Sequence, residues 1–479
     1  MDPLLLLHSP FAVLLLFAAI FGIVFVYYLL WFFLPQSRGV KHYQEKRYEQ
    51  AVASFQGVLK RRPPAGIEAD TRRRLADTLD VLGRGDEAAQ ERERAEAAIA
   101  RSPKDAMALQ AQGDLLKRKY QYDEACEAYF QALTKMPAVD GAGRALVMAK
   151  LAHAHYEASR PADTVQWAKA ALASRPDPVT RRAMERMSAV GYATQGDVEK
   201  AEIHYREALR LSEQSAIPKE IAQDLSSLAG IQKKRGHFEE AIAACHKARQ
   251  VFAEPSRISY STEAETLRDM GRFDEARAVM EQRRHAPGFD QPDVERRMQA
   301  LSALGSAWIE ARADQPDAAL AFVEQARPAF EAKVASSSTW PPAPQKGDDK
   351  LLLWCDAVKT LALAQRGDTE AARQLHTDVL RRLPLFHQDR ASQLTVSAHL
   401  GRASFVLNDL AEAKALFQQY CHYLPDPSSR PSALYWLGET HLRLGETDTA
   451  RDFFRQAVAP GIDSLDARRA QARLNELGG

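Results

Sequence analysis

The sequence predicts an all-α protein: an N-terminal transmembrane helix, an α-solenoid of about eleven stacked helical hairpins and a C-terminal capping helix. The main observation is a repeat of about 34 residues in which Gly is followed by Ala, then by an aromatic or apolar residue, then by Ala. It is plainest at Gly196, Ala201, Tyr205 and Ala208, at Gly236, Ala241, Cys245 and Ala248, and at Gly445, Ala450, Phe454 and Ala457. Small residues at fixed offsets are typical of hairpins that bury their apolar faces only against one another.

The second observation is an uncharged run near the N-terminus. Residues 11–34 contain no Asp, Glu, Lys or Arg. A helix of this length extends about 36 Å, enough to cross a hydrocarbon core of about 30 Å. A cleaved signal peptide would need a basic residue before the run and a small-residue cleavage site, and the sequence has neither. We therefore expect a retained transmembrane helix at 11–34 after a short tail at 1–10.

Flanking charges predict the orientation of this helix. No Lys or Arg precedes the run, whereas Arg38, Lys41, Lys46 and Arg47 follow it closely. Basic residues are retained on the cytoplasmic side of a membrane. We expect a single-pass protein, in a bacterial inner membrane, with its soluble part in the cytoplasm; a periplasmic soluble part is the alternative.

Hairpin signals then follow one another along the chain. Each predicted hairpin has small residues where its two helices meet, and many end at Pro, which cannot continue a helix. The markers of the remaining hairpins are, in chain order, Gly39, Ala51, Phe55 and Pro63; Leu75, Ala76, Leu79, Gly83 and Ala88; Gly113, Leu116, Ala125, Tyr129, Ala132 and Pro137; Leu151, Ala152, Ala168, Ala171 and Pro176; Ala264, Leu267, Gly271, Ala276 and Met280; Ala307, Ala319, Val323 and Ala326; Leu363, Gly367, Ala372 and Pro384; and Gly401, Ala413, Phe417 and Pro425. We expect the solenoid over residues 35–335 and 350–462.

Two segments depart from the repeat. Residues 336–349 are rich in Ser and Pro, which predicts an extended, exposed insertion. Residues 463–479 have the pattern of a helix with a polar face. We expect this last segment to be the capping helix that an open stack of hairpins needs at its end.

Composition argues against several functional classes. The net charge is only +1, so no overall field attracts nucleic acid. The cysteines, Cys126, Cys245, Cys355 and Cys421, lie too far apart in sequence for a metal-binding motif. No HExxH, Walker, GxGxxG or GxSxG motif is present. We predict that the protein is not an enzyme and uses no cofactor, metal, nucleic acid or small-molecule substrate.

The marker residues resemble the signature of the tetratricopeptide repeat (TPR) superfamily, in which W-x2-L-G-x2-Y is followed by A-x3-F and Pro. In the eleventh hairpin, Gly438, Ala450 and Phe454 carry this resemblance. The resemblance extends over residues 39–479. It implies a superhelix whose concave groove is lined by the first helix of each hairpin and holds a peptide.

Carried over by register, the resemblance places nine residues in that groove. These are Lys117, Arg118, Tyr156, Arg186, Lys233, Lys234, Arg268, Trp308 and Trp354. Acidic residues lie among them, so we expect a groove that is mildly basic in the middle and more apolar toward its C-terminal half. Such a surface favours acidic peptide segments as partners. The alternative interpretation is an ordinary solvated surface of mixed charge.

These expectations predict a membrane-anchored scaffold or adaptor that recruits partner proteins through the concave groove. An anchor followed by cytoplasmic repeats also resembles the layout of bacterial inner-membrane TPR regulators of lipopolysaccharide assembly. Their cysteine-rich, metal-binding C-terminal domain has no counterpart in this sequence. The alternative function is a periplasmic TPR assembly factor for an envelope complex.

Overall fold

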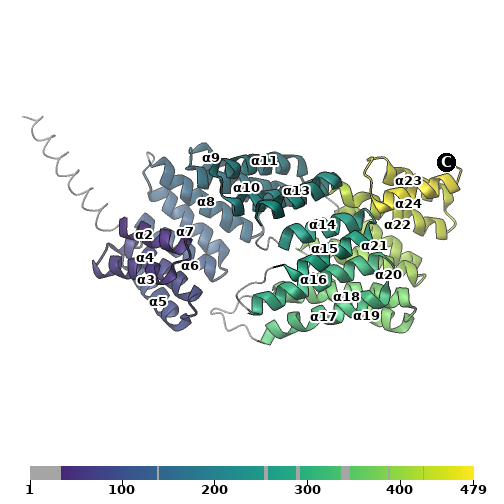
Figure 1. The fold of residues 1–479 in the computed structure, drawn as a ribbon, viewed down its shortest axis with the longest axis horizontal. Helices are drawn as coiled ribbons and strands as arrows, with labels where there is room; N and C mark the ends of the chain where they lie inside the picture. Colours follow the sequence, from purple (N-terminus) through teal and green to yellow (C-terminus); the bar gives the residue numbers. More distant parts are fainter. Residues whose placement is uncertain are drawn as a thin grey trace, which may run out of the picture. The chain divides into compact units, whose positions relative to one another are not determined.

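The computed structural model describes residues 34–137, 140–252, 257–286, 292–335, 346–386, 389–423 and 426–478. Every regular element within these ranges is a helix (Figure 1), so the predicted all-α class is confirmed. The chain divides into an N-terminal unit, Met1–Met187, and a C-terminal unit, Ser188–Gly479.

The expected transmembrane helix at 11–34 lies outside the described residues, apart from Leu34. Among the helices of the described ranges, none combines the length and apolar character that crossing a bilayer requires. The anchor therefore stays a prediction from the sequence.

The N-terminal unit consists of consecutive helical hairpins. They are α2 (Leu34–Gln44) with α3 (Tyr48–Lys60), α4 (Ala65–Val81) with α5 (Gly85–Arg101), α6 (Ala106–Arg118) with α7 (Tyr122–Lys135), and α8 (Gly141–Glu157) with α9 (Pro161–Ala173). Helix α10 (Pro178–Gln195) begins in this unit and ends in the next one.

The C-terminal unit continues the same arrangement. After α10 come α11 (Val198–Ser215), α12 (Pro218–Arg235), α13 (Phe238–Val251), α14 (Arg257–Asp269), α15 (Phe273–His285), α16 (Pro292–Arg312), α17 (Pro316–Ala335), α18 (Lys346–Arg366), α19 (Thr369–Arg382), α20 (Arg390–Val406), α21 (Leu410–Tyr423), α22 (Arg430–Arg443), α23 (Thr447–Val458) and α24 (Leu465–Glu476). Two short 3-10 turns, η3 (Leu383–Phe386) and η4 (Pro427–Ser429), precede α20 and α22.

The expected insertion at 336–349 differs from the structure at its C-terminal end. Helix α18 begins at Lys346, so residues 346–349 are helical rather than extended. Asp349 falls within the first turn of α18, where the helix dipole favours negative charge. Residues 336–345 lie outside the described ranges.

A recurring close contact explains the Gly in the first helix of several hairpins. Gly39, Gly113, Gly401 and Gly438 each face an aromatic ring of the second helix, which belongs to Phe55, Tyr129, Phe417 and Phe454 respectively. A Cβ at Gly438 would lie 2.6 Å from Cδ1 of Phe454. All four rings are buried. The absence of a side chain on the first helix therefore makes room for the ring and fixes the distance between the two helices.

The C-terminal end of the C-terminal unit folds back onto earlier hairpins of that unit. Ile462 contacts Gly236 after α12, and Leu465 contacts Gly271 after α14. Arg468 donates a hydrogen bond to the carbonyl of Met270, 198 residues away in sequence. These contacts close the hairpins from α12 to α23 into a ring.

Ring closure corrects the expectation of an open stack. The predicted capping segment contains α24, which packs on α22 and α23 as a cap should. Its beginning, however, also contacts the ends of α14 and α16, and Ile462, just before the segment, contacts the turn after α12. The physical reason is complementarity: Ile462 and Leu465 fit against turns at Gly236 and Gly271, where the backbone has a positive φ and bears no side chain.

Candidate functional site

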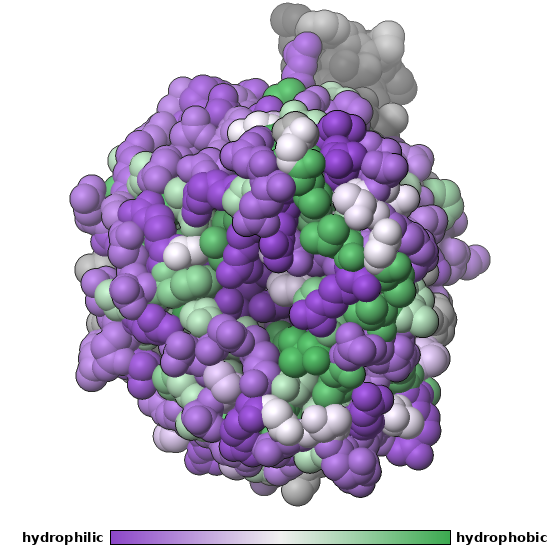
Figure 2. All heavy atoms as spheres, turned by 90° about the vertical axis from the view of Figure 1, so that its right-hand side faces the viewer, coloured by the Kyte–Doolittle hydropathy of each residue, from purple (hydrophilic) through white to green (hydrophobic). Residues whose placement is uncertain are grey.

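The inner face of the ring holds two hollows that share Arg268 and Trp308. The charged hollow, of about 230 Å³, is walled by α12, α14, α16, α20, α21 and α22, by η4 and by the start of α24. The apolar hollow, of about 280 Å³, lies mainly between α14, α16 and α18. Figure 2 views the molecule from the right-hand side of Figure 1. It shows a hollow whose rim carries both hydrophilic and hydrophobic residues.

Two cations on one side of the charged hollow are neutralised by carboxylates. The Nζ of Lys233 lies 2.5 Å from an oxygen of Glu265 and 3.6 Å from one of Asp269. Arg268 donates to Asp269 at 2.8 Å. Burial alone would raise the pKa values of Glu265 and Asp269, but the two cations outweigh it and hold both below their ordinary values.

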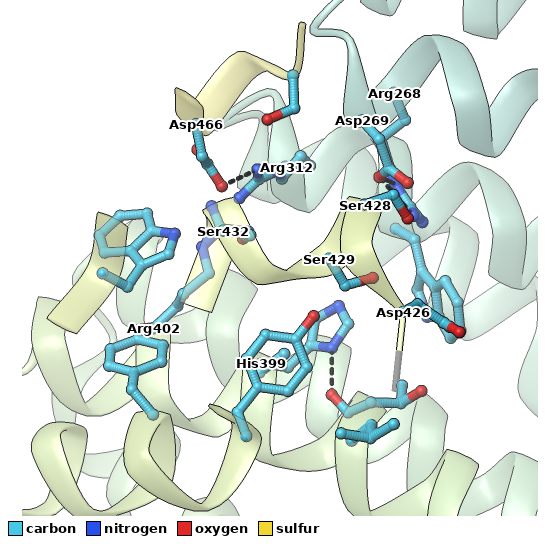
Figure 3. Close-up of a pocket in the computed structure, with 18 of the residues that line it drawn as sticks. Arg268, Asp269, Arg312, His399, Arg402, Asp426, Ser428, Ser429, Ser432 and Asp466 are labelled. Carbon is cyan, nitrogen blue, oxygen red and sulfur yellow. Dashed lines mark hydrogen bonds and ion pairs between the residues drawn. The ribbon is translucent and has the colours of Figure 1, made fainter. Parts of the chain in front are cut away.

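A third cation is neutralised at the point where the ring closes. Arg312, at the end of α16, donates a hydrogen bond to the carboxylate of Asp466 at the start of α24 (Figure 3). Arg469 lies 3.4 Å from the same carboxylate. Asp466 is fully buried. This ion pair therefore forms one wall of the charged hollow and also joins the two ends of the ring.

Arg402 is the exception among the cations that line the charged hollow. No carboxylate of the described residues makes an ion pair with it, and its Nε is buried without a hydrogen-bond partner. Its guanidinium lies over the indole of Trp436, 5.1 Å from the ring centroid. Burial and the charge of Arg312 lower the pKa of Arg402 to about 9. In Figure 3 its side chain points toward the Arg312–Asp466 pair.

Two indole donors of the charged hollow also lack partners. The Nε1 atoms of Trp308 and Trp436 are buried without a hydrogen bond. In contrast, Nε1 of Trp354, in the apolar hollow, donates to the hydroxyl of Ser392 at 3.1 Å. A buried N–H without a partner is unfavourable, so these donors are suited to an acceptor that enters the hollow.

His399 adds an acceptor to the same hollow. Its Nδ1 lies 2.7 Å from the carbonyl oxygen of Thr395, which can only accept, so Nδ1 carries the proton. Burial lowers the pKa of His399 to about 4, so the ring is neutral at physiological pH. Its Nε2 is therefore an acceptor, suited to an N–H group of a ligand.

The structure places five of the predicted groove residues in this part of the ring. Lys233, Arg268 and Trp308 line the charged hollow, and Trp354 lines the apolar one. Lys234 lies 3.7 Å from Asp426, beside η4. Because carboxylates pair with all three of these cations, the predicted basic character of the middle of the groove is largely neutralised.

The other four predicted residues belong to the N-terminal unit. Arg118 forms ion pairs with Asp77 and Asp80. Burial lowers the pKa of Lys117. Tyr156 is exposed, and its ring meets that of His153 edge to face at 6.3 Å. Arg186, on α10, is half-buried. Of these three basic residues, Arg118 is thus neutralised by carboxylates of the chain.

Sequence reasoning missed Arg402, although a signal for it was present. In two hairpins an acidic residue follows the Gly that contacts the aromatic ring. These are Asp114, which pairs with Lys150 at 2.9 Å, and Glu439, which pairs with Arg473 at 2.6 Å. In α20 the residue after Gly401 is Arg402. In the first hairpin the residue after Gly39 is the uncharged Val40, so Arg402 is the only base at this position among the four hairpins with a Gly–ring contact.

Residues 399–467 and residues 259–282 match the tetratricopeptide repeat family. These matches support a TPR superfamily protein. The longer match contains Arg402, Trp436 and Asp466 and thus covers much of the charged hollow. No curated protein sequence matches the chain.

Among solved structures, a Rap protein complexed with competence and sporulation factor covers 78% of this chain and 99% of its own, with 12% identity and a TM-score of 0.53. That similarity shows a shared helical fold. A tetratricopeptide repeat protein from Parabacteroides merdae covers 62% of this chain and 99% of its own, with 13% identity and a TM-score of 0.39. The Cut9–Hcn1 structure covers 94% and 83%, with 14% identity and a TM-score of 0.47.

Proposed function

We propose that this protein is a scaffold that binds partner proteins by holding a peptide segment of the partner inside the ring of the C-terminal unit. The observation that carries the proposal is the pair of adjoining hollows, one charged and one apolar, on either side of Arg268 and Trp308. Their size suits a few residues of extended chain rather than a folded domain. A peptide also has the required chemistry, because polar backbone groups alternate with apolar side chains.

The apolar hollow is the anchor site in this proposal. Met280, Met298 and Leu301 line it together with Trp308 and Trp354, whose rings lie 5.6 Å apart. Methionine side chains adapt to ligands of different shape, and tryptophan and arginine often contribute most of the binding energy of an interface. We expect a bulky apolar side chain of the partner to enter here.

A chain with this fold can hold another molecule, as the Rap protein does with competence and sporulation factor. The matches to the tetratricopeptide repeat family favour protein partners as a class. We propose acidic peptide segments as the partners. Their negative charge would bind at Arg402, because Lys233 and Lys234 already pair with carboxylates of the chain.

Filling the apolar hollow should abolish peptide binding. Met298→Trp places an indole in the hollow, whereas Gln299→Trp adds the same group at an exposed neighbouring position. We expect random heptapeptides displayed on phage to be enriched by the unmodified chain and by Gln299→Trp, with enrichment at least tenfold lower for Met298→Trp. Equal enrichment by the two variants would contradict the proposed anchor site.

The proposed membrane location rests on residues 11–34 and the basic residues that follow them. We propose that this segment anchors the protein and that the repeats recruit partners to the cytoplasmic face. A fluorescent protein fused after Gly479 should then fluoresce, and an alkaline phosphatase fused there should be inactive. The opposite pair of results would favour the periplasmic assembly factor.

A further inference from the structure

We infer that the charged hollow contains a carboxylate-binding subsite at Arg402, which takes a carboxylate of the bound peptide. This inference rests on the proposed function and specifies the ligand of the same site. The subsite consists of the Arg402 guanidinium and the indole N–H groups of Trp308 and Trp436. Arg402 is not among the basic residues that the sequence analysis placed in the groove.

Charge balance is the first argument. Four cations line the charged hollow, and three of them, Lys233, Arg268 and Arg312, already contact carboxylates of the chain. A guanidinium away from bulk water needs a compensating charge. The carboxylates of Asp466 and Asp314 act on Arg402 only as nearby charges, and Asp466 already pairs with Arg312 and Arg469. One uncompensated positive charge matches one carboxylate. A phosphate dianion would bring more negative charge than this hollow leaves unpaired.

The register of the repeats is the second argument. In α6 and α22 the Gly that contacts the aromatic ring is followed by an acidic residue, which pairs with a basic residue on a later helix. Asp114 pairs with Lys150, and Glu439 pairs with Arg473. Those ion pairs hold consecutive elements together. Arg402 occupies the equivalent position in α20 but forms no such pair within the described residues. Its charge does not hold two hairpins together and is therefore available to a ligand.

The hydrogen-bonding groups around Arg402 are the third argument. A guanidinium binds a carboxylate through parallel N–H donors, and the two indole N–H groups supply further donors. Trp436 is held in place by Phe405 and Phe417, whose ring centroids lie 5.2 and 6.1 Å from its own. The Trp436 donor is thus fixed before any ligand binds.

Acceptors in the same hollow indicate that the carboxylate belongs to a peptide rather than to a simple anion. His399 offers Nε2, and Oδ1 of Asp426 is buried without a hydrogen-bond partner. Both can accept from backbone N–H groups. Figure 3 shows Asp426 across the hollow from Arg402, and His399 lies on α20 one turn before Arg402. A ligand that carries a carboxylate and nearby amide N–H groups can reach all three residues.

The test uses the full-length chain labelled with 5-fluorotryptophan, with its six tryptophan resonances assigned by single Trp→Phe variants. The probes are N-acetylalanine, N-acetylalaninamide and inorganic phosphate. We expect N-acetylalanine to shift the fluorine resonances of Trp308 and Trp436 in a saturable manner. The amide, which lacks the charge, should cause no shift. Phosphate should bind at least tenfold more weakly than N-acetylalanine.

Two variants link these shifts to Arg402. In Arg402→Gln the response to N-acetylalanine should weaken at least tenfold, and Arg402→Lys should retain part of it because the charge remains. The melting temperature of Arg402→Gln should be equal to or above that of the unmodified chain, because the variant removes an uncompensated charge. A lower melting temperature would assign Arg402 a structural role and overturn the inference.

Other outcomes would also overturn the inference. A response to phosphate but not to N-acetylalanine would give the subsite to a different anion. Unchanged shifts in Arg402→Gln would place the carboxylate elsewhere. Failure of the subsite remains distinguishable from failure of the proposed function: peptides selected by display would still bind, and Met298→Trp would still abolish their binding.

Discussion

Replacing Gly438 by Ala is expected to lower the free energy of unfolding of the α22–α23 hairpin by about 2 kcal/mol. The new methyl group would lie 2.6 Å from Cδ1 of Phe454, a ring that is fully buried and cannot move without disturbing its neighbours. Overpacking of this kind costs about 1–3 kcal/mol, and only part is offset by the better helix propensity of Ala. Amide hydrogen exchange in α22 and α23 measures the effect locally.

The matched control is Gly230→Ala in α12. A Cβ at Gly230 meets nothing within 4 Å, so only the gain in helix propensity remains. This variant should raise the local free energy of unfolding by about 0.5–1 kcal/mol. Effects of the same sign at Gly438 and Gly230 would contradict the packing role that we assign to the contact between glycine and the aromatic ring.

Replacing Asp466 by Ala is expected to have the largest effect of a single change in the ring. Asp466 is fully buried and accepts a hydrogen bond from Arg312, so its removal leaves a largely buried guanidinium without its carboxylate. Breaking a buried pair in this way costs about 3–5 kcal/mol. Thermal unfolding should report this loss, and hydrogen exchange should rise at the ends of α12, α14 and α16, where the ring closes.

The control for this variant is Asp448→Ala. Asp448 lies 2.7 Å from Arg451, but its side chain is 97% exposed, so the ion pair should contribute less than about 0.5 kcal/mol. A small effect at Asp466, similar to that at Asp448, would mean that the pair with Arg312 does not hold the ring closed.

The dependence of this effect on pH has a definite sign. Burial would raise the pKa of Asp466, but the charge and hydrogen bond of Arg312 outweigh it and leave the pKa below its ordinary value of 3.8. A carboxyl group with a depressed folded-state pKa stabilises the protein above its unfolded pKa and loses that contribution as pH falls through the folded value. The difference in stability between the unmodified chain and Asp466→Ala should therefore be constant near neutral pH and shrink below about pH 4.

The all-α class and the succession of hairpins could be predicted because their causes are local in sequence. The spacing from Gly438 to Phe454 places both residues at the same level of one hairpin, and the same spacing recurs at Gly113 and Tyr129. Any chain with such spacing brings these residues into contact when the hairpin forms. The periodic pattern is therefore enough to predict which residues of the two helices of a hairpin pack against each other.

Closure of the ring could not be predicted in this way. The contact of Leu465 with Gly271 joins segments that are far apart in sequence, and no period relates them. It depends on the summed curvature of all the hairpins between them. The neutralisation of Lys233 by Glu265 is similar, because it requires knowing which side chains of successive first helices face one another. Arg402 was predictable in principle, since it is a base at a repeat position where two other hairpins have an acid.

The central claim is that residues 462–468 close the hairpins of the C-terminal unit into a ring around the binding site. The double variant Gly271→Cys/Leu465→Cys tests it most directly. A Cβ at Gly271 would lie 3.3 Å from Cβ of Leu465, near the separation of about 3.5–4.5 Å in disulfides. We expect a disulfide between the two introduced cysteines to form under mild oxidation in the folded chain and to raise the melting temperature. A folded double variant that retains both introduced thiols under those conditions, as peptide mass analysis would reveal, would contradict the closed ring.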